Sequence, residues 1–376
     1  MSALRRKIVW FLVGNPDNTA SSRIHGIRVH EKLRELGYHS VLAYRPAGVE
    51  EVVPFNQKDI DDLEKVFQRG DIAIFQKIKS EANFALFEVL RRLGVKLVLI
   101  DCDLPLSEKA AELMDLVICT SSLLADLYAQ KGATSIYIED SPESFFLPRD
   151  AKSAEKLLCY WFGEGSGGKW KDVEILKDII KNEKRLERWE LVTISNHPDA
   201  DIKWHSGFLR NLLDADVVVV PVFQESEAWQ VKSANRILQA MALSLPVLCS
   251  PIPSYRNIIK QNKNGIICYS KEDWVNALIG MEQASNRACL GANAFATAQS
   301  YNLDINIDRW INNLQLDDHF KVSGSLKEVK ENKKIQRYFF GKLLQRNIGY
   351  WNAAPFTLLN IWAYFKARTH NLIKRV

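Results

Sequence analysis

The sequence has no long apolar run and is poor in cysteine. None of its uninterrupted apolar stretches approaches the roughly 20 residues that a helix needs to span a bilayer. The run IVWFLV after Arg5 and Arg6 is also too short for the hydrophobic region of a signal peptide, so it predicts a first buried strand. The six cysteines are scattered without any Cys-x-x-Cys pair, which predicts core thiols rather than disulfides or zinc ligands. We therefore expect a cytoplasmic protein, with four cysteines in or beside strands: Cys119, Cys159, Cys249 and Cys268.

The net charge is small, at +5, but it is unevenly distributed. Residues 321–376 contain twelve Lys and Arg against two Glu, a net charge of +10, so residues 1–320 carry −5. The same basic segment holds aromatic side chains such as Trp351 and Trp362. This composition is typical of an amphipathic helix on an anionic membrane surface. Nucleic acid is not expected as a partner, because no recognised nucleic-acid-binding module accompanies the basic residues.

Short apolar runs of strand length alternate with helical patterns along most of the chain. Strands that are apolar throughout, separated by helices, predict a parallel sheet covered on both faces. The alternation pauses at residues 140–156, where prolines and charges indicate a linker, and then resumes. The expected fold class is α/β, with two doubly wound Rossmann-like domains and a ligand cleft between them. The predicted parts are residues 1–145, residues 152–315, and a basic helical tail over residues 316–376.

A glycine-rich stretch opens the second predicted domain. In FGEGSGGKW, Gly163, Gly165 and Gly168 form a Gly-x-Gly-x-x-Gly pattern between a strand and a helix. Such glycines let the backbone approach a pyrophosphate, and Lys169 directly after them favours a phosphate loop. A nicotinamide site would also need an acid at the end of the next strand, but that strand ends in Ser195. A tight turn without a ligand is the other alternative.

Basic residues stand at the start of a predicted helix farther along. The stretch SANRILQAMAL predicts a helix from Ser233, its N-cap, to Leu243. A helix N-terminus favours acidic side chains, so Lys232 and Arg236 in the first turn indicate a bound anion. The alternative is a solvated polar face. The next strand and its loop, PVLCSPIPSY, favour the anion site because they would lie beside this helix start. The candidate residues of this region are Lys232, Asn235, Arg236, Gln239, Ser254 and Tyr255.

Two motifs in this half resemble those of GT-B glycosyltransferases, especially the glycosyltransferase family 4-like group 1. They are ADVVVVP, residues 215–221, and LQAMALSLPVL, residues 238–248, and the resemblance in order and spacing extends over about residues 7–300. Two positions depart from the family pattern. The acidic pair of its E-x(7)-E motif falls on Val231 and Gln239, and its helix-ending glycine falls on Ser244.

The resemblance implies a metal-independent glycosyltransferase that uses a nucleotide-diphosphate-sugar and no cofactor. Fixed cations would stabilise the departing diphosphate, and Gln239 would contact the donor ribose in place of the family's glutamate. Tyr255 or Trp161 could stack on the base. The expected acceptor is a glycan or lipid-linked precursor of a surface polysaccharide. The donor-binding residues implied are Gly163, Gly165, Lys169, Lys232, Asn235, Arg236, Gln239, Ser254 and Tyr255.

In the first predicted domain, four residues are candidates for chemistry. The loop and helix NTASSRIHG contain Arg23, expected at a phosphate or at the acceptor, and His25, a candidate general base. The sequence Asp101-Cys102-Asp103 follows an apolar strand, and we expect its carboxylates in the cleft, with acid or base roles rather than metal binding.

Three alternatives stay open at this point. A chain that has lost its acidic pair could be a catalytically inactive GT-B-like scaffold, and the glycine pattern leaves a nicotinamide oxidoreductase as a weaker alternative. The basic tail could bind the inner face of a membrane, or it could pack on the N-terminal domain, as C-terminal helices do in GT-B folds.

Overall fold

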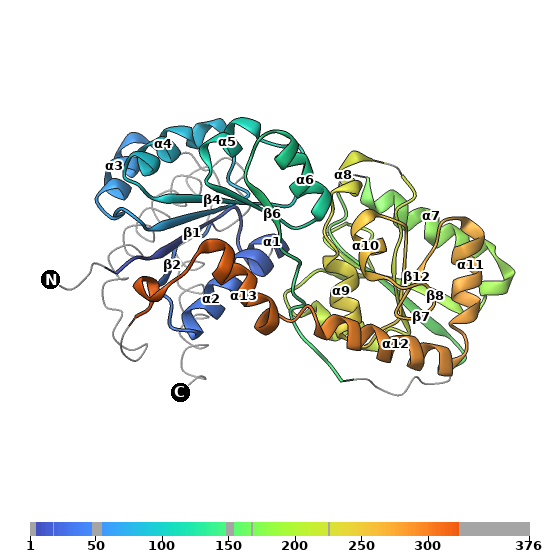
Figure 1. Ribbon diagram of the computed structural model, residues 1–376. Helices are drawn as coiled ribbons and strands as arrows, with labels where there is room; N and C mark the ends of the chain where they lie inside the picture. The colour runs from blue at the N-terminus through green and yellow to red at the C-terminus, as the bar shows by residue number, and fades with distance from the viewer. Residues whose placement is uncertain are drawn as a thin grey trace, which may run out of the picture. The chain divides into compact units, whose positions relative to one another are not determined.

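The computed structural model describes residues 5–17, 19–46, 55–147, 154–166, 168–224 and 226–322. It contains two six-stranded sheets in which every described strand pair is parallel, and helices connect the strands (Figure 1). The predicted α/β class with two doubly wound sheets is confirmed. The predicted tail lies outside the described residues from residue 323 onward.

The first sheet has the strand order β2-β1-β3-β4-β5-β6. Its strands are β1 (Ile8–Leu12), β2 (Ser40–Tyr44), β3 (Ile72–Gln76), β4 (Lys96–Asp101), β5 (Leu116–Cys119) and β6 (Ser135–Tyr137). The helices of this half are α1 (Ala20–Ser22), the π-helix η1 (Arg23–Ile27), α2 (Arg28–Glu35), α3 (Gln57–Glu64), η2 (Glu81–Asn83), α4 (Phe84–Arg92), α5 (Glu108–Leu113) and α6 (Ser122–Gln130). Helices α3, α4 and α5 lie on one side of this sheet, and α2 lies on the other (Figure 1).

The second sheet has the strand order β12-β11-β10-β7-β8-β9. Its strands are β7 (Leu157–Phe162), β8 (Trp189–Ser195), β9 (Ile202–Lys203), β10 (Val217–Val220), β11 (Val247–Cys249) and β12 (Ile266–Ile267). Each of these strands except the two-residue β9 coincides with one of the short apolar runs of the sequence. The helices are α7 (Lys169–Asn182), η3 (Lys184–Leu186), η4 (Phe208–Asp214), α8 (Glu227–Gln230), α9 (Asn235–Ala242), α10 (Pro253–Ile258), α11 (Lys271–Gly280), α12 (Ala284–Gln299), α13 (Leu303–Leu314) and η5 (Asp318–Phe320).

Strand β10 shows why the central strands are apolar throughout. Successive side chains of a strand point to opposite faces of its sheet. Val217 and Val219 pack in one apolar cluster with α7, whereas Val218 and Val220 pack in another with α9. The four thiols predicted to be core residues are buried, which agrees with strands covered on both faces.

The chain returns to the first sheet after α12. Helix α13 lies beside α2 (Figure 1), and its Leu303, Ile307 and Trp310 belong to the same apolar cluster as Trp10 of β1. The ring centroids of Trp10 and Trp310 are 6.3 Å apart. The predicted second domain extended to residue 315, but the amphipathic α13 packs its apolar face on the first sheet instead. Among the helices of the described ranges, none is both long and apolar enough to cross a bilayer.

Candidate functional site

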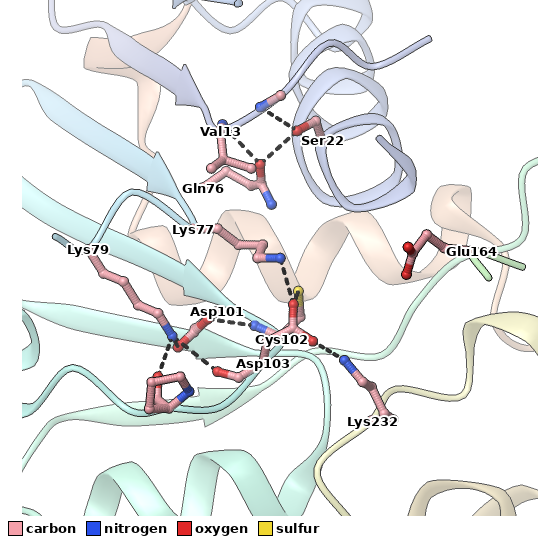
Figure 2. Close-up of polar contacts among 12 residues, drawn as sticks. Val13, Ser22, Gln76, Lys77, Lys79, Asp101, Cys102, Asp103, Glu164 and Lys232 are labelled. Atoms are coloured by element: carbon pink, nitrogen blue, oxygen red, sulfur yellow. Dashed lines mark hydrogen bonds and ion pairs between the residues drawn. The ribbon is translucent and has the colours of Figure 1, made fainter. Parts of the chain in front are cut away.

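The carboxyl ends of β3 and β4 bring a carboxylate between two lysines. Asp103 follows β4, and one of its oxygens lies 2.5 Å from Lys77 Nζ, just after β3. Its other oxygen forms an ion pair with Lys232, which precedes α9 in the second half of the chain (Figure 2). Burial alone would raise the pKa of Asp103, but the two ammonium groups hold this pKa well below its usual range. Two predicted residues, Asp103 and Lys232, are therefore brought together, although as partners of each other.

Asp101 supports this arrangement through its own hydrogen bonds. One of its oxygens accepts hydrogen bonds from Lys79 Nζ and from the Tyr128 hydroxyl, both at 2.6 Å. Its other oxygen accepts the Cys102 N–H at 2.9 Å. The side chain of Asp101 is fully buried, so its predicted acid or base role is not supported, because no substrate atom could reach it. We assign Asp101 a structural role.

A polar network holds the loop after β1 to the end of β3. The Gln76 side-chain oxygen accepts hydrogen bonds from the Val13 N–H at 3.3 Å and from the Ser22 hydroxyl at 2.9 Å (Figure 2). The Ser22 hydroxyl in turn accepts the Gly14 N–H at 3.2 Å. These bonds fix the end of β3, from which Lys77 projects.

Lys77 was not predicted from the sequence. Its backbone φ is +58°, in the left-handed region that favours glycine. Burial lowers the pKa of its ammonium group, whereas the Asp103 carboxylate raises it. The carboxylate prevails, and the pKa of Lys77 is raised. The rule that ligands bind beyond the carboxyl ends of parallel strands could have found it, because Lys77 is the first residue after β3.

The glycine loop after β7 is closely packed. A Cβ atom at Gly165 would lie 2.6 Å from the Cβ of His197, so only glycine fits there, and the φ of +84° at Gly168 also favours glycine. The N–H groups of Gly163 and Gly165 already donate hydrogen bonds, to the Ile194 carbonyl and to the Asn196 side chain. These two glycines therefore let neighbouring groups lie close to the backbone, but their N–H groups are not free to bind a ligand.

Lys169 does not stand free after this loop. Its Nζ lies 2.5 Å from a carboxylate oxygen of Glu164, which is half-exposed. Burial by itself would raise the pKa of Glu164, but the hydrogen bond from Lys169 lowers this pKa. A ligand phosphate would have to compete with Glu164 for Lys169.

Arg236 lies directly beside the glycine loop. Its guanidinium is 3.6 Å from the position that a Cβ of Gly163 would occupy, and it lies 5.3 Å from the centre of the Trp229 ring. The Tyr255 hydroxyl is hydrogen-bonded to Arg236, and burial raises the pKa of this hydroxyl. Among the described residues, no carboxylate forms an ion pair with Arg236, so its charge is available to a ligand.

The aromatic stacking predicted for the donor base is not supported. Tyr255 and Trp161 are both buried to 1% exposure, and Trp161 packs against Trp170 in the core beside the second sheet. A base could not reach either ring. Tyr255 instead orients Arg236, a role that the sequence pattern did not indicate.

Helix α9 begins at Asn235, slightly later than predicted. Its N-cap is Ala234 rather than Ser233, and Lys232 precedes the first turn. Gln239 is buried, and both ends of its amide are satisfied: its oxygen accepts the Glu143 N–H at 3.0 Å, and its nitrogen donates to Asn235 at 3.1 Å. The predicted ribose contact of Gln239 is therefore not supported, because the amide joins α9 to the segment between the sheets.

Arg23 and His25 are also bound to the segment that connects the two sheets. Arg23 lies in the π-helix η1 and makes a two-pronged ion pair with Glu143, with one bond of 2.9 Å. His25 is buried and hydrogen-bonded to the buried Asp140. The general-base role of His25 stays a prediction, since its side chain is 8% exposed and bound to Asp140. Arg23 lines a polar cavity of about 400 Å³ and could still contact an acceptor there.

Two further predictions concern Ser254 and metal binding. The Ser254 hydroxyl is buried and has no hydrogen-bond partner among the described residues. Across the described ranges, no cluster of His, Cys, Asp or Glu is suited to hold a metal ion. That the reaction needs no metal stays a prediction.

Comparison with known proteins identifies the domain type. Residues 169–283 match the family model described as glycosyl transferases group 1. A comparison with the sequences of curated proteins found no match.

Solved structures of similar fold cover most of the chain. HepE from Anabaena, solved with UDP and glucose, superposes with a TM-score of 0.63 at 14% identity, over 83% of this chain and 99% of its own. Sucrose-phosphate synthase from Thermosynechococcus elongatus gives a TM-score of 0.63 at 12% identity, over 83% and 98%. The pneumococcal O-GlcNAc transferase GtfA gives 0.54 at 14% identity, over 69% and 60%. The chain therefore has the GT-B fold, and its residues 169–283 are similar to group 1 glycosyl transferases.

Proposed function

We propose that this protein transfers a sugar from a nucleotide-diphosphate donor to a glycan or lipid-linked acceptor in surface polysaccharide biosynthesis. The observation that carries the proposal is Arg236. Its guanidinium has no carboxylate partner among the described residues, is held by Tyr255, and lies against Gly163, where the backbone permits a close approach. A cation fixed in this way suits the diphosphate that departs as the glycosidic bond breaks.

Lys232 would supply a second positive charge. It lies three residues before the first residue of α9, and its present partner is Asp103. A diphosphate carries more negative charge than one carboxylate, so it can compete for this ammonium group. The expected donor state has Lys232 and Arg236 on the diphosphate, with Asn235 and Ser254 as additional polar contacts.

The donor class is supported by relatives of the same fold. HepE was solved with UDP-glucose, and the pneumococcal transferase GtfA with UDP and GlcNAc. For this chain we propose a nucleotide-sugar donor without assigning the base or the sugar.

The acceptor would occupy the cavity of about 400 Å³ beside η1 and α2. Arg23, Arg28 and Arg45 line this cavity together with Asp17 and Glu143. A mixture of carboxylates and guanidinium groups suits the many hydroxyl groups of a sugar, because each can bind two of them. We propose a cytoplasmic site of action, with residues 321–376 on the inner face of a membrane.

A catalytically inactive scaffold is the second candidate function. It is favoured by Gln239, which stands where the family has a glutamate and is satisfied within the protein. A scaffold would need neither Arg236 nor a bound diphosphate, so the two candidates differ at this residue.

The deciding experiment measures hydrolysis and transfer with a panel of nucleotide sugars. For the transferase, Arg236→Ala should lower kcat/KM by about 10²- to 10³-fold, as does loss of other fixed donors at a developing charge. Arg210→Ala is the matched control, because Arg210 is an exposed arginine of the same half. Absence of turnover and of nucleoside diphosphate binding in the unmodified protein would reject the proposal in favour of the scaffold.

A further inference from the structure

We propose that Lys77 is an additional binding residue for the donor diphosphate, contributed by the first sheet. This inference rests on the proposed function. It adds a cation from β3 to the cations already assigned around α9 and the glycine loop.

The backbone at Lys77 has a conformation that is unfavourable for lysine. A φ of +58° disfavours any residue with a Cβ atom, and glycine would adopt it without strain. Strained residues of this type concentrate at binding and catalytic sites. Here the strained residue is the first after a central strand, at the edge of the sheet where ligands bind.

The contacts of Lys77 differ from those of its neighbour Lys79. Lys79 Nζ donates to Asp101 at 2.6 Å and to the carbonyls of Asp103 and Pro105 at 3.0 and 2.8 Å, so its donors are occupied. Lys77 Nζ contacts one carboxylate, that of Asp103, among the described residues. Lys79 is therefore structural, whereas Lys77 has donor capacity left for a ligand.

Asp103 links Lys77 to Lys232. The two ammonium groups lie on different oxygens of one carboxylate, so they are close together and the three side chains carry a net charge of +1 (Figure 2). Their side chains are 23%, 26% and 30% exposed for Lys77, Asp103 and Lys232, so solvent and a ligand can reach them. An anion that binds Lys232 therefore also lies within reach of Lys77.

The chemical group recognised is a phosphate. Two ammonium groups beside one carboxylate leave a net positive charge. This charge favours binding of an anionic phosphate over a neutral sugar hydroxyl. The phosphate could belong to the donor or to a lipid-linked acceptor. We assign it to the donor diphosphate, because Lys77 shares its counter-ion with Lys232, and the experiment separates the two sources.

The experiment compares Lys77→Gly, Lys77→Met and Lys77→Arg with the unmodified protein by isothermal titration calorimetry. The probes are UDP, GDP and ADP, the corresponding monophosphates, and farnesyl phosphate as a probe for a lipid-linked phosphate. Lys109→Met is the control, because Lys109 is 73% exposed and lies on α5. Glycine relieves the left-handed backbone but loses the ion pair with Asp103, so thermal unfolding of each variant first establishes that it is folded.

The Gly and Met variants should bind the preferred nucleoside diphosphate about tenfold more weakly or worse, which is typical for loss of a charge-assisted hydrogen bond. The effect on the monophosphate should be smaller, and Lys77→Arg should restore most of the affinity. Unchanged diphosphate affinity in the folded Gly and Met variants would overturn the inference while leaving the proposed function intact. A loss confined to farnesyl phosphate would overturn the donor assignment. Failure of the unmodified protein to bind any diphosphate would reject both proposals.

Discussion

Replacing Asp103 with asparagine should strengthen diphosphate binding. In the structure Asp103 neutralises part of the charge of Lys77 and Lys232, and a bound diphosphate would have to share these ammonium groups with it. The asparagine side chain has nearly the same shape as aspartate but no negative charge. The net charge of the three positions would therefore rise from +1 to +2.

The size of the effect follows from the geometry. At an effective dielectric constant of about 20, two unit charges 4 Å apart interact by about 4 kcal/mol. The three side chains are between 23% and 30% exposed, so solvent screening reduces this value, and we expect a gain of about 1–2 kcal/mol. That gain corresponds to about 5- to 30-fold tighter binding.

Asp103→Asn should also lower the stability of the protein at neutral pH. The folded-state pKa of Asp103 is depressed, so its contribution to stability is present above the unfolded-state pKa and is lost as the pH falls through the folded-state pKa. At pH 7 the contribution is complete, and the variant should unfold at a lower denaturant concentration.

The assay is calorimetric titration of the variant with the nucleoside diphosphate that the unmodified protein prefers, at low and at high salt. The gain in affinity should shrink at high salt, because salt screens the charges. It should also shrink in a Lys232→Met background, which removes one of the freed ammonium groups. Weaker binding by a folded Asp103→Asn protein would refute the reasoning and make Asp103 part of the binding site.

Two other predictions concern buried groups. Burial, with a smaller effect from Arg34, lowers the pKa of His30 to about 4, so the unfolded state binds the additional proton first as the pH falls. Stability should therefore decrease by up to about 3 kcal/mol between pH 6.5 and pH 4, and a His30→Gln variant followed by urea unfolding should lose this dependence. Gln239→Glu, which restores the family residue, should cost about 1–3 kcal/mol of unfolding free energy at pH 7, because the donation to Asn235 is lost. An unchanged unfolding midpoint would show that the Asn235 amide reorients without cost.

The strands could be predicted because each carries its own signal. Val217–Val220 is apolar at every position, since both faces of its sheet are covered. Strand β9 was missed because two residues are too short for any periodicity. The packing of α13 on the first sheet was missed for a different reason: its amphipathic pattern shows that one face is buried but does not show against which sheet.

The site could be predicted only in part. The basic residues near α9 and the glycine loop are local patterns, and the structure places Arg236 beside Gly163. The partners of the charged groups are not local. Lys232 and Asp103 are 129 residues apart in the chain, and Gln239 and Glu143 are 96 apart. The positive charge of Lys232 therefore indicated a bound anion, but it did not reveal that the protein itself places the Asp103 carboxylate there.

A crystal structure of the protein with its preferred nucleoside diphosphate tests the central claim most directly. The account predicts diphosphate oxygens within hydrogen-bonding distance of Arg236 and Lys232, with the ion pair between Lys232 and Asp103 opened. A diphosphate bound elsewhere, with Lys232 still on Asp103 and Arg236 making no contact with the diphosphate, would contradict it.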